Sequence, residues 1–164
     1  VDRGYTRDFA EGIFKQMEGF GEYGFPESHA ASFAMLVYAS SWLKCHHPDA
    51  FLCGLLNAQP MGFYAPSQLF QDAQRHGVKV LPVDVQCSAL QSTLENLHGS
   101  AQNSTALLPV RLGLNRVNSL KSEAALRIIH ARENGLFDSV EDLTKRAQLD
   151  RGDLIALADA NAAR

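Results

Sequence analysis

The sequence predicts a mainly α-helical protein that carries one small β element. Apolar residues recur at three- and four-residue steps from residue 5 to 17 and again from 122 to 132, which is the spacing of an amphipathic helix. The run from 78 to 85 is instead rich in β-branched residues and alternates in part, which indicates a short extended segment. With 164 residues, 46% of them hydrophobic, the chain is large enough to close at least one core.

Helices and one loop are expected in the first sixty residues. The first helix should end at Gly19, and residues 19–26, where glycines alternate with aromatic side chains, should form a shaped loop. Residues 27–46 predict a long, apolar and mostly buried helix that follows a proline suited to a helix start. Pro48 breaks this helix and begins the next one.

The middle of the chain contains the expected boundary between two units. A fourth helix is predicted at about residues 67–76, ahead of the extended segment. Residues 86–105 are rich in Ser, Thr, Asn, Gln and Gly, with one strand expected at 92–94. We therefore expect a first unit at residues 1–105 and a second at residues 106–164.

Three short helices joined by tight turns are expected after the apolar stretch 107–114. Ser122 is the expected N-cap of the first helix, which should close at Gly135. Ser139 and Asp150 are each followed by an aspartate three residues later, a pattern typical of helix starts. The sequence therefore predicts a compact helical module at the C-terminal end.

The charge of the chain is unevenly distributed. The net charge is −3, yet residues 1–105 carry 6 Lys and Arg against 10 Asp and Glu, whereas residues 106–164 carry 9 against 8. Contacts to a phosphate backbone are therefore expected in the C-terminal third.

Several classes of protein are disfavoured by composition. The longest strongly apolar stretch, residues 30–43, is interrupted by serines and is shorter than the ~20 residues that span a bilayer, and the N-terminal residues do not resemble a secretion signal. We expect no membrane association. The sequence does not begin with Met, which we interpret as the edge of a longer chain or as processing.

Three cysteines without a C-x-x-C pair suit a reducing cytoplasm, and we expect a cytoplasmic protein with Cys45, Cys53 and Cys87 as small buried residues. Adjacent helical residues point to different faces, so Cys45-His46-His47 cannot jointly surround a zinc ion. We expect no metal site in this chain.

Residues 20–31 combine a glycine-supported loop with a helix start, a surface suited to an anion or a nucleobase. Taken alone, this segment is more often a turn whose aromatic residues seal a core. Together with residues 32–34, 38–48, 57–64 and 71–78, it resembles the C-terminal fingers segment of bacterial C-family DNA polymerases, the α-subunit type of DNA polymerase III. Pro26-Glu27 replaces the usual Asn-Lys, and this departure resembles the error-prone, damage-inducible branch.

The resemblance implies that part of this segment lies near the nascent base pair. The residues expected there are Tyr23, Gly24, Phe25, Ser28 and His29. A histidine on an apolar helix is equally a hydrogen-bonded core residue. Because Glu27 stands where the family has lysine, any phosphate contact of that lysine is absent or reversed.

Residues 112–129 resemble a helix-hairpin-helix, in which a tight turn offers backbone N–H groups to one DNA phosphate. The usual turn is Gly-hydrophobic-Gly, whereas this chain has Ser119-Leu120-Lys121, where the lysine charge partly compensates for the missing glycines. Residues 137–158 resemble the second half of the module. The expected backbone-binding residues are Arg116, Ser119, Leu120, Lys121 and Arg127, with Lys145, Arg146 and Arg151 as a second group, although each cation is equally a solvated surface charge.

The resemblance implies an error-prone DNA-directed DNA polymerase used in damage-induced translesion synthesis. Its metal-binding carboxylates, which would hold Mg²⁺, belong to a palm region upstream, so this chain is expected to lack catalytic residues and cofactors and to be inactive alone. Primer-template duplex and, in the longer protein, an incoming deoxynucleotide are the expected partners, with other replication or repair proteins besides. Two alternatives stay open: a stand-alone DNA-structure-binding module of a repair or recombination protein, and a helical scaffold for protein partners.

Overall fold

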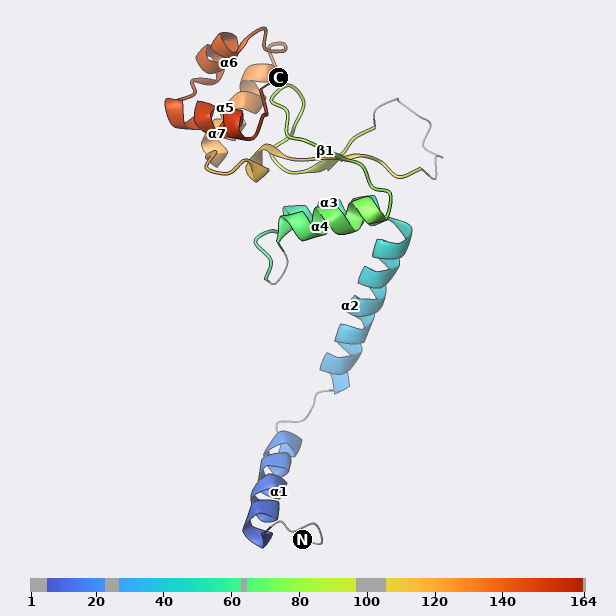
Figure 1. Cartoon of the computed structure of the whole chain (residues 1–164). Helices are drawn as coiled ribbons and strands as arrows, with labels where there is room; N and C mark the ends of the chain where they lie inside the picture. Colours follow the sequence, from blue (N-terminus) through green and yellow to red (C-terminus); the bar gives the residue numbers. More distant parts are fainter. Residues whose placement is uncertain (1–5, 23–26, 63–64, 97–105, 164) are drawn as a thin grey trace. The chain divides into compact units, whose positions relative to one another are not determined.

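The computed structural model describes residues 6–22, 27–62, 65–96 and 106–163 (Figure 1). It contains two compact units, Val1–Trp42 and Leu43–Arg164. The described residues form seven α-helices, one 3-10 helix and three short strands. The prediction of a mainly α fold with a small β element is therefore confirmed.

The N-terminal part consists of α1 (Arg7–Glu22) and α2 (Glu27–His46), whose last residues belong to the second unit. The predicted bounds of α2 are correct. The prediction that Gly19 ends the first helix is wrong, because α1 continues to Glu22. An isolated glycine costs a helix only about 1 kcal/mol relative to alanine, so glycine alone does not stop one.

The described side chains of α2 are exposed rather than buried, apart from the half-buried Lys44. Its large apolar residues include Phe33, Leu36, Tyr38 and Trp42, and each of them is exposed. The prediction of a mostly buried helix is wrong for the described chain. A helix that is apolar on all sides needs neighbours on all sides, and the described residues of the first unit do not provide them.

The second unit begins with two packed helices, α3 (Pro48–Asn57) and α4 (Pro66–Arg75). Together with the strands that follow, they bury a small apolar core, made of Leu52, Leu56, Ala73, Val78 and Val110. The buried carboxylate of Asp49, in the first turn of α3, accepts a hydrogen bond from the backbone N–H of Leu108 at 2.8 Å. This bond ties α3 to the chain entering the last strand.

The sheet has the strand order β1-β3-β2, with β1 (Val80–Leu81), β2 (Thr93–Leu94) and β3 (Val110–Arg111). The central strand β3 runs parallel to β1 and antiparallel to β2. The first two strands were predicted from the sequence, whereas β3 was not. Its two residues lie within an apolar run that has no strand periodicity of its own.

Polar side chains join the end of α3, the residue before β2 and the residue before the 3-10 helix. The side chain of Asn57 accepts from the backbone N–H of Ser92 and donates to its carbonyl, both at 2.8 Å. The hydroxyl of Ser92 then accepts from the backbone N–H of Gly113 at 3.2 Å. A side chain at Gly113 would have its Cβ 2.6 Å from the carbonyl oxygen of Leu90, so only glycine fits this crossing.

The C-terminal helices are η1 (Leu114–Arg116), α5 (Ser122–Arg132), α6 (Val140–Ala147) and α7 (Arg151–Asp159). Ser139 and Asp150 cap α6 and α7, as predicted. The prediction for Ser122 is wrong by one residue, because Lys121 is the N-cap of α5 and no side chain caps this helix. The backbone of Lys121 is extended and Ser122 is already helical, so the helix begins one residue earlier than a serine cap at residue 122 would require.

These helices share the larger of the two cores of the described residues with residues of the strand region. Leu114, Ile128, Leu143 and Leu157 are completely buried there, and Val85 packs with them. Residues before and after position 105 therefore contribute to one core. The division into units at 1–105 and 106–164 stays a prediction.

The C-terminal helices form two hairpins that are related by a shift of 29 residues. The first hairpin comprises η1, the first turn (Ser119-Leu120-Lys121) and α5; the second comprises α6, the second turn (Gln148-Leu149-Asp150) and α7. The shift superposes the buried leucines Leu114 and Leu143 and the exposed apolar residues Leu126 and Ile155. The two hairpins thus share a buried leucine at the start and an exposed apolar residue in the second helix.

Candidate nucleic-acid interface

The first turn has the backbone geometry that a glycine turn would have. Ser119 has a φ of 65°, in the left-handed region that favours glycine. Lys121, with φ −72° and ψ 146°, then leads into α5. Leu120 packs against the core and anchors the turn. Ser119 therefore adopts the left-handed conformation although it is not glycine.

The helix that leaves the first turn offers backbone donors. The first N–H groups of any α-helix lack partners within the helix, and a side-chain cap normally satisfies some of them. No side chain caps α5. Ser119 and Lys121 are both exposed. Exposed N–H groups, the positive end of the helix dipole and a lysine side chain together suit one phosphate group.

The second turn has the same shape and the opposite charge. Gln148 has a φ of 50°, matching Ser119. Asp150 is the N-cap of α7. Its carboxylate accepts a hydrogen bond from the backbone N–H of Asp153 at 2.8 Å, and the carboxylate of Asp153 accepts one from the backbone N–H of Asp150 at 3.2 Å. The backbone N–H of Asp153 lowers the pKa of Asp150, and the charge of Lys121 contributes to this shift. An anionic cap occupies the donors of α7, so this turn is unsuited to phosphate.

Two of the predicted backbone-binding arginines make internal contacts. The Arg127 guanidinium donates to the carbonyls of Ala147 at 2.9 Å and Gln148 at 3.3 Å, and it pairs with Asp153 at 3.4 Å. Arg127 therefore holds α5 against the second turn. Its role as a DNA contact stays a prediction.

Arg146 is the second arginine with internal contacts. It donates to the carbonyls of Ala131, Gly135 and Leu136 at 2.5, 2.7 and 2.9 Å, and its guanidinium lies 4.7 Å from the ring centre of Phe137. These contacts close the C-terminal end of α5. The ion pair of Arg146 with Asp142 holds the pKa of that carboxyl below its usual range.

A family model for the helix-hairpin-helix motif matches residues 77–164. This range contains both turns and all the helices of the two hairpins. The chain belongs to the helix-hairpin-helix family. The helix-hairpin-helix prediction is thereby confirmed.

Curated relatives match nearly the whole chain. Proteins named error-prone DNA polymerase from Bordetella parapertussis and Burkholderia mallei are 57% and 60% identical over 99% of this chain, and one from Methylococcus capsulatus is 54% identical over 98%. The chain spans only about 15% of the length of these relatives. Similarity to proteins of that name agrees with the resemblance drawn from the sequence.

The other cations near the helix-hairpin-helix turns have fewer contacts. The half-buried Arg116 donates to the side chain of Asn115 at 3.2 Å. Lys145 and Arg151 are exposed on the second hairpin. The structure thus brings Arg116, Ser119 and Lys121 together at the first hairpin and puts the second group on the other. Sequence reasoning missed the matching second turn, although the 29-residue spacing of its leucines is visible in the sequence.

Of the residues expected near a base pair, Tyr23, Gly24 and Phe25 lie outside the described residues. Ser28 belongs to the first turn of α2. His29 is exposed, and its ring centre lies 4.5 Å from that of Phe33. His29 is therefore a surface residue in this unit, and its role beside a nucleotide stays a prediction.

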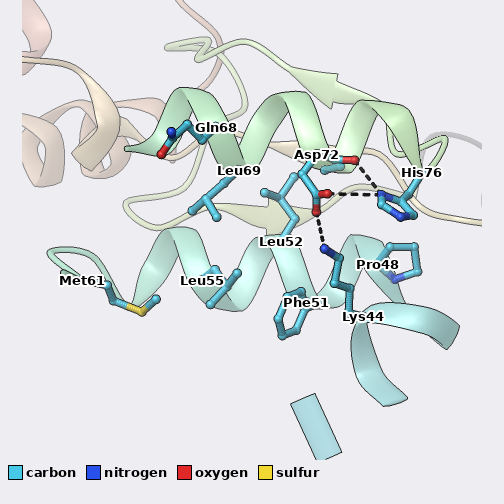
Figure 2. Close-up of a pocket in the computed structure, with 11 residues that line it drawn as sticks. Lys44, Pro48, Phe51, Leu52, Leu55, Met61, Gln68, Leu69, Asp72 and His76 are labelled. Carbon is cyan, nitrogen blue, oxygen red and sulfur yellow. Dashed lines mark hydrogen bonds and ion pairs between the residues drawn. The ribbon is translucent and has the colours of Figure 1, made fainter. Parts of the chain in front are cut away.

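A hollow of about 490 Å³ lies between α3 and α4 within the second unit (Figure 2). Its walls are mainly apolar and include Phe51, Leu55 and Leu69. At one end of the hollow the Lys44 Nζ lies 2.8 Å from the Asp72 Oδ2. The hydrogen bond from Lys44 lowers the pKa of the Asp72 carboxyl. Among the described residues that line it, Lys44 is already paired to a carboxylate, so this hollow does not resemble a phosphate site.

The cysteines and histidines of the described chain do not gather into a metal-binding cluster. No group of three or more His, Cys, Asp or Glu in the described ranges is arranged to hold a metal ion. Cys45 and Cys87 are exposed thiols, so the expectation that the three cysteines are buried is wrong for these two. The helices of the described chain include none that is long and apolar enough to cross a bilayer.

Proposed function

We propose that this chain is the DNA-gripping segment of an error-prone DNA polymerase. The helix-hairpin-helix family and the relatives of that name support this function. Within the segment, the first turn binds one phosphate of a duplex through the backbone N–H groups at the start of α5, and Lys121 adds a charge contact. Binding of this kind depends on the backbone and not on base sequence.

The observation that carries the proposal is the difference between the two turns. Both have a left-handed first residue and lead into a helix. Only the first leaves its helix without a side-chain cap, with Lys121 where the second has the anionic cap Asp150. A phosphate is therefore attracted to one turn and repelled from the other, which fixes how the module faces DNA.

The rest of the proposed role concerns the longer protein. Residues 1–105 form the C-terminal part of the fingers, and Tyr23, Gly24, Phe25, Ser28 and His29 help to seat the template or the incoming nucleotide. The bond-making Mg²⁺ ions are held by palm carboxylates outside this chain, which alone does not polymerise DNA. The whole protein acts in the cytoplasm during translesion synthesis.

The salt dependence of duplex binding tests the phosphate contact. Log affinity falls with log salt at a slope of about 0.9 per phosphate contacted, so Lys121→Ala is expected to reduce the slope by about 1. We expect weak binding, on the order of 10⁻⁴ to 10⁻⁶ M, measured by fluorescence anisotropy of a labelled duplex. Lys79→Ala, which removes an exposed cation outside the hairpins, is the charge-matched control. Equal slopes for both variants would contradict the proposal.

A further inference from the structure

A cavity of about 520 Å³ lies between the first hairpin and α7. On one side it is lined by Val117, Asn118 and Ser119, and on the other by Ile155, Ala156 and Asp159. The 29-residue shift that relates the two hairpins identifies the interface to which this cavity corresponds.

By this shift, the cavity between η1 and α7 corresponds to the packed interface between α6 and α5. Adding 29 to the residue numbers of η1 gives residues of α6, and subtracting 29 from those of α7 gives residues of α5. The helices α5 and α6 pack directly on one another. Two guanidinium groups close that interface. Arg127 of α5 reaches the carbonyls of Ala147 and Gln148, and Arg146 of α6 reaches the carbonyl of Ala131.

At the cavity, both arginines are replaced. The position equivalent to Arg127 is Ala156, and the position equivalent to Arg146 is Val117. The carbonyls equivalent to those bound by Arg127 belong to Asn118 and Ser119, and within the described chain no hydrogen bond ends on either oxygen. The first hairpin thus retains the acceptors of an arginine site without its arginine.

We propose that this cavity binds the guanidinium group of an arginine side chain from a protein partner. The planar guanidinium can donate to both carbonyls and to the exposed carboxylate of Asp159, as Arg127 does with two carbonyls and a carboxylate. The exposed side chain of Ile155 offers an apolar surface for the aliphatic stem. Arg116 also lines the cavity, and its charge opposes that of the ligand, so an isolated arginine binds weakly.

The site can be tested on the whole chain by NMR, with N-acetyl-arginine amide as the probe and N-acetyl-lysine amide as its matched control. The arginine probe is expected to shift the amide signals of Ser119, Gly152 and Ala156 saturably, with a dissociation constant on the order of 1 to 10 mM. The lysine probe should bind at least about five-fold more weakly, since an ammonium lacks the planar fork of donors. Equal shifts with both probes, or none with arginine, would overturn the proposal.

Substitutions in and near the cavity test whether the arginine probe binds there. Ala156→Arg supplies the missing guanidinium from within and should abolish the response, whereas Ala158→Arg, on the exposed face of the same helix, should leave it unchanged. Because a buried Ala156→Arg change can also disturb folding, Asp159→Asn provides a second arm, with an expected affinity loss of about five-fold. Unchanged affinity in Asp159→Asn would sink the assignment. Duplex binding is a separate measurement, so this site and the DNA contact fail independently.

Discussion

Removing the Arg127 side chain separates a structural role from a DNA-contact role. Arg127→Ala deletes a hydrogen bond of 2.9 Å to the carbonyl of Ala147, a longer one of 3.3 Å to Gln148 and an ion pair of 3.4 Å with Asp153. The side chain of Asp153 is only 4% exposed, so its carboxylate would lose a cation in a desolvated place. The change therefore weakens the join between α5 and the second turn.

The magnitude follows from the geometry of these contacts. The short bond contributes about 1.5 kcal/mol and the two long contacts about 0.5 kcal/mol each, so the free energy of unfolding should fall by about 2 to 3 kcal/mol. For a chain of this size the melting temperature should fall by roughly 5 to 10 °C. Urea denaturation followed by circular dichroism gives the same quantity from the midpoint, with an unchanged m-value.

Lys145→Ala is the control for this measurement. Lys145 is exposed on α6, so its removal should change the free energy of unfolding by no more than about 0.5 kcal/mol. The opposite pattern would refute the reasoning: an Arg127→Ala protein of unaltered stability whose DNA-binding salt slope drops by about 1. Such a result would mean that Arg127 contacts a DNA phosphate and does not stabilise the fold.

Two further predictions concern the geometry and charge around the hairpins. In Gly113→Ala the new Cβ would meet the backbone of Leu90 at 2.6 Å and disturb the hydrogen bond from the Gly113 N–H to Ser92, so we expect a loss of at least about 3 kcal/mol in urea denaturation; a loss below 1 kcal/mol would disprove the close crossing. The pKa of Asp150 is lowered in the folded protein, so its charge stabilises the fold above its ordinary pKa of about 3.9 and this stability is lost as pH falls through the folded-state value. Asp150→Asn keeps a capping oxygen but does not titrate, so its melting temperature should be below that of the unaltered chain at neutral pH. The two melting temperatures should converge as the pH falls through the lowered folded-state pKa of Asp150, and a constant difference would contradict the assignment.

Local signals predicted much of the helical structure. Prolines on either side of α2 fixed its bounds at Glu27–His46, and aspartates three residues after Ser139 and Asp150 marked the starts of α6 and α7. Each of these signals acts within one helical turn, so it survives without knowledge of the tertiary structure.

What the sequence did not predict depends on contacts between distant residues. β3 is a strand because β1 and β2 pair with it from both sides. β3 itself has only two residues, too few to show the alternation of apolar and polar residues that predicts a strand. Arg127 looks like any exposed cation in the sequence, and only the fold brings the carbonyls of Ala147 and Gln148 to it. The left-handed turn at Ser119 was obscured by the absence of glycine, although its leucine spacing repeats in the second hairpin.

The contrast between the two turns can be measured in a single spectrum. Adding a short DNA duplex to the labelled chain at low salt should shift the backbone amide signals of Ser119, Lys121 and Ser122 progressively, because their N–H groups surround the proposed phosphate. The signals of the matching second turn, at Gln148 and Arg151, should stay nearly still beside the anionic cap. Equal shifts at both turns, or larger shifts at the second, would contradict the claim that the first hairpin grips DNA.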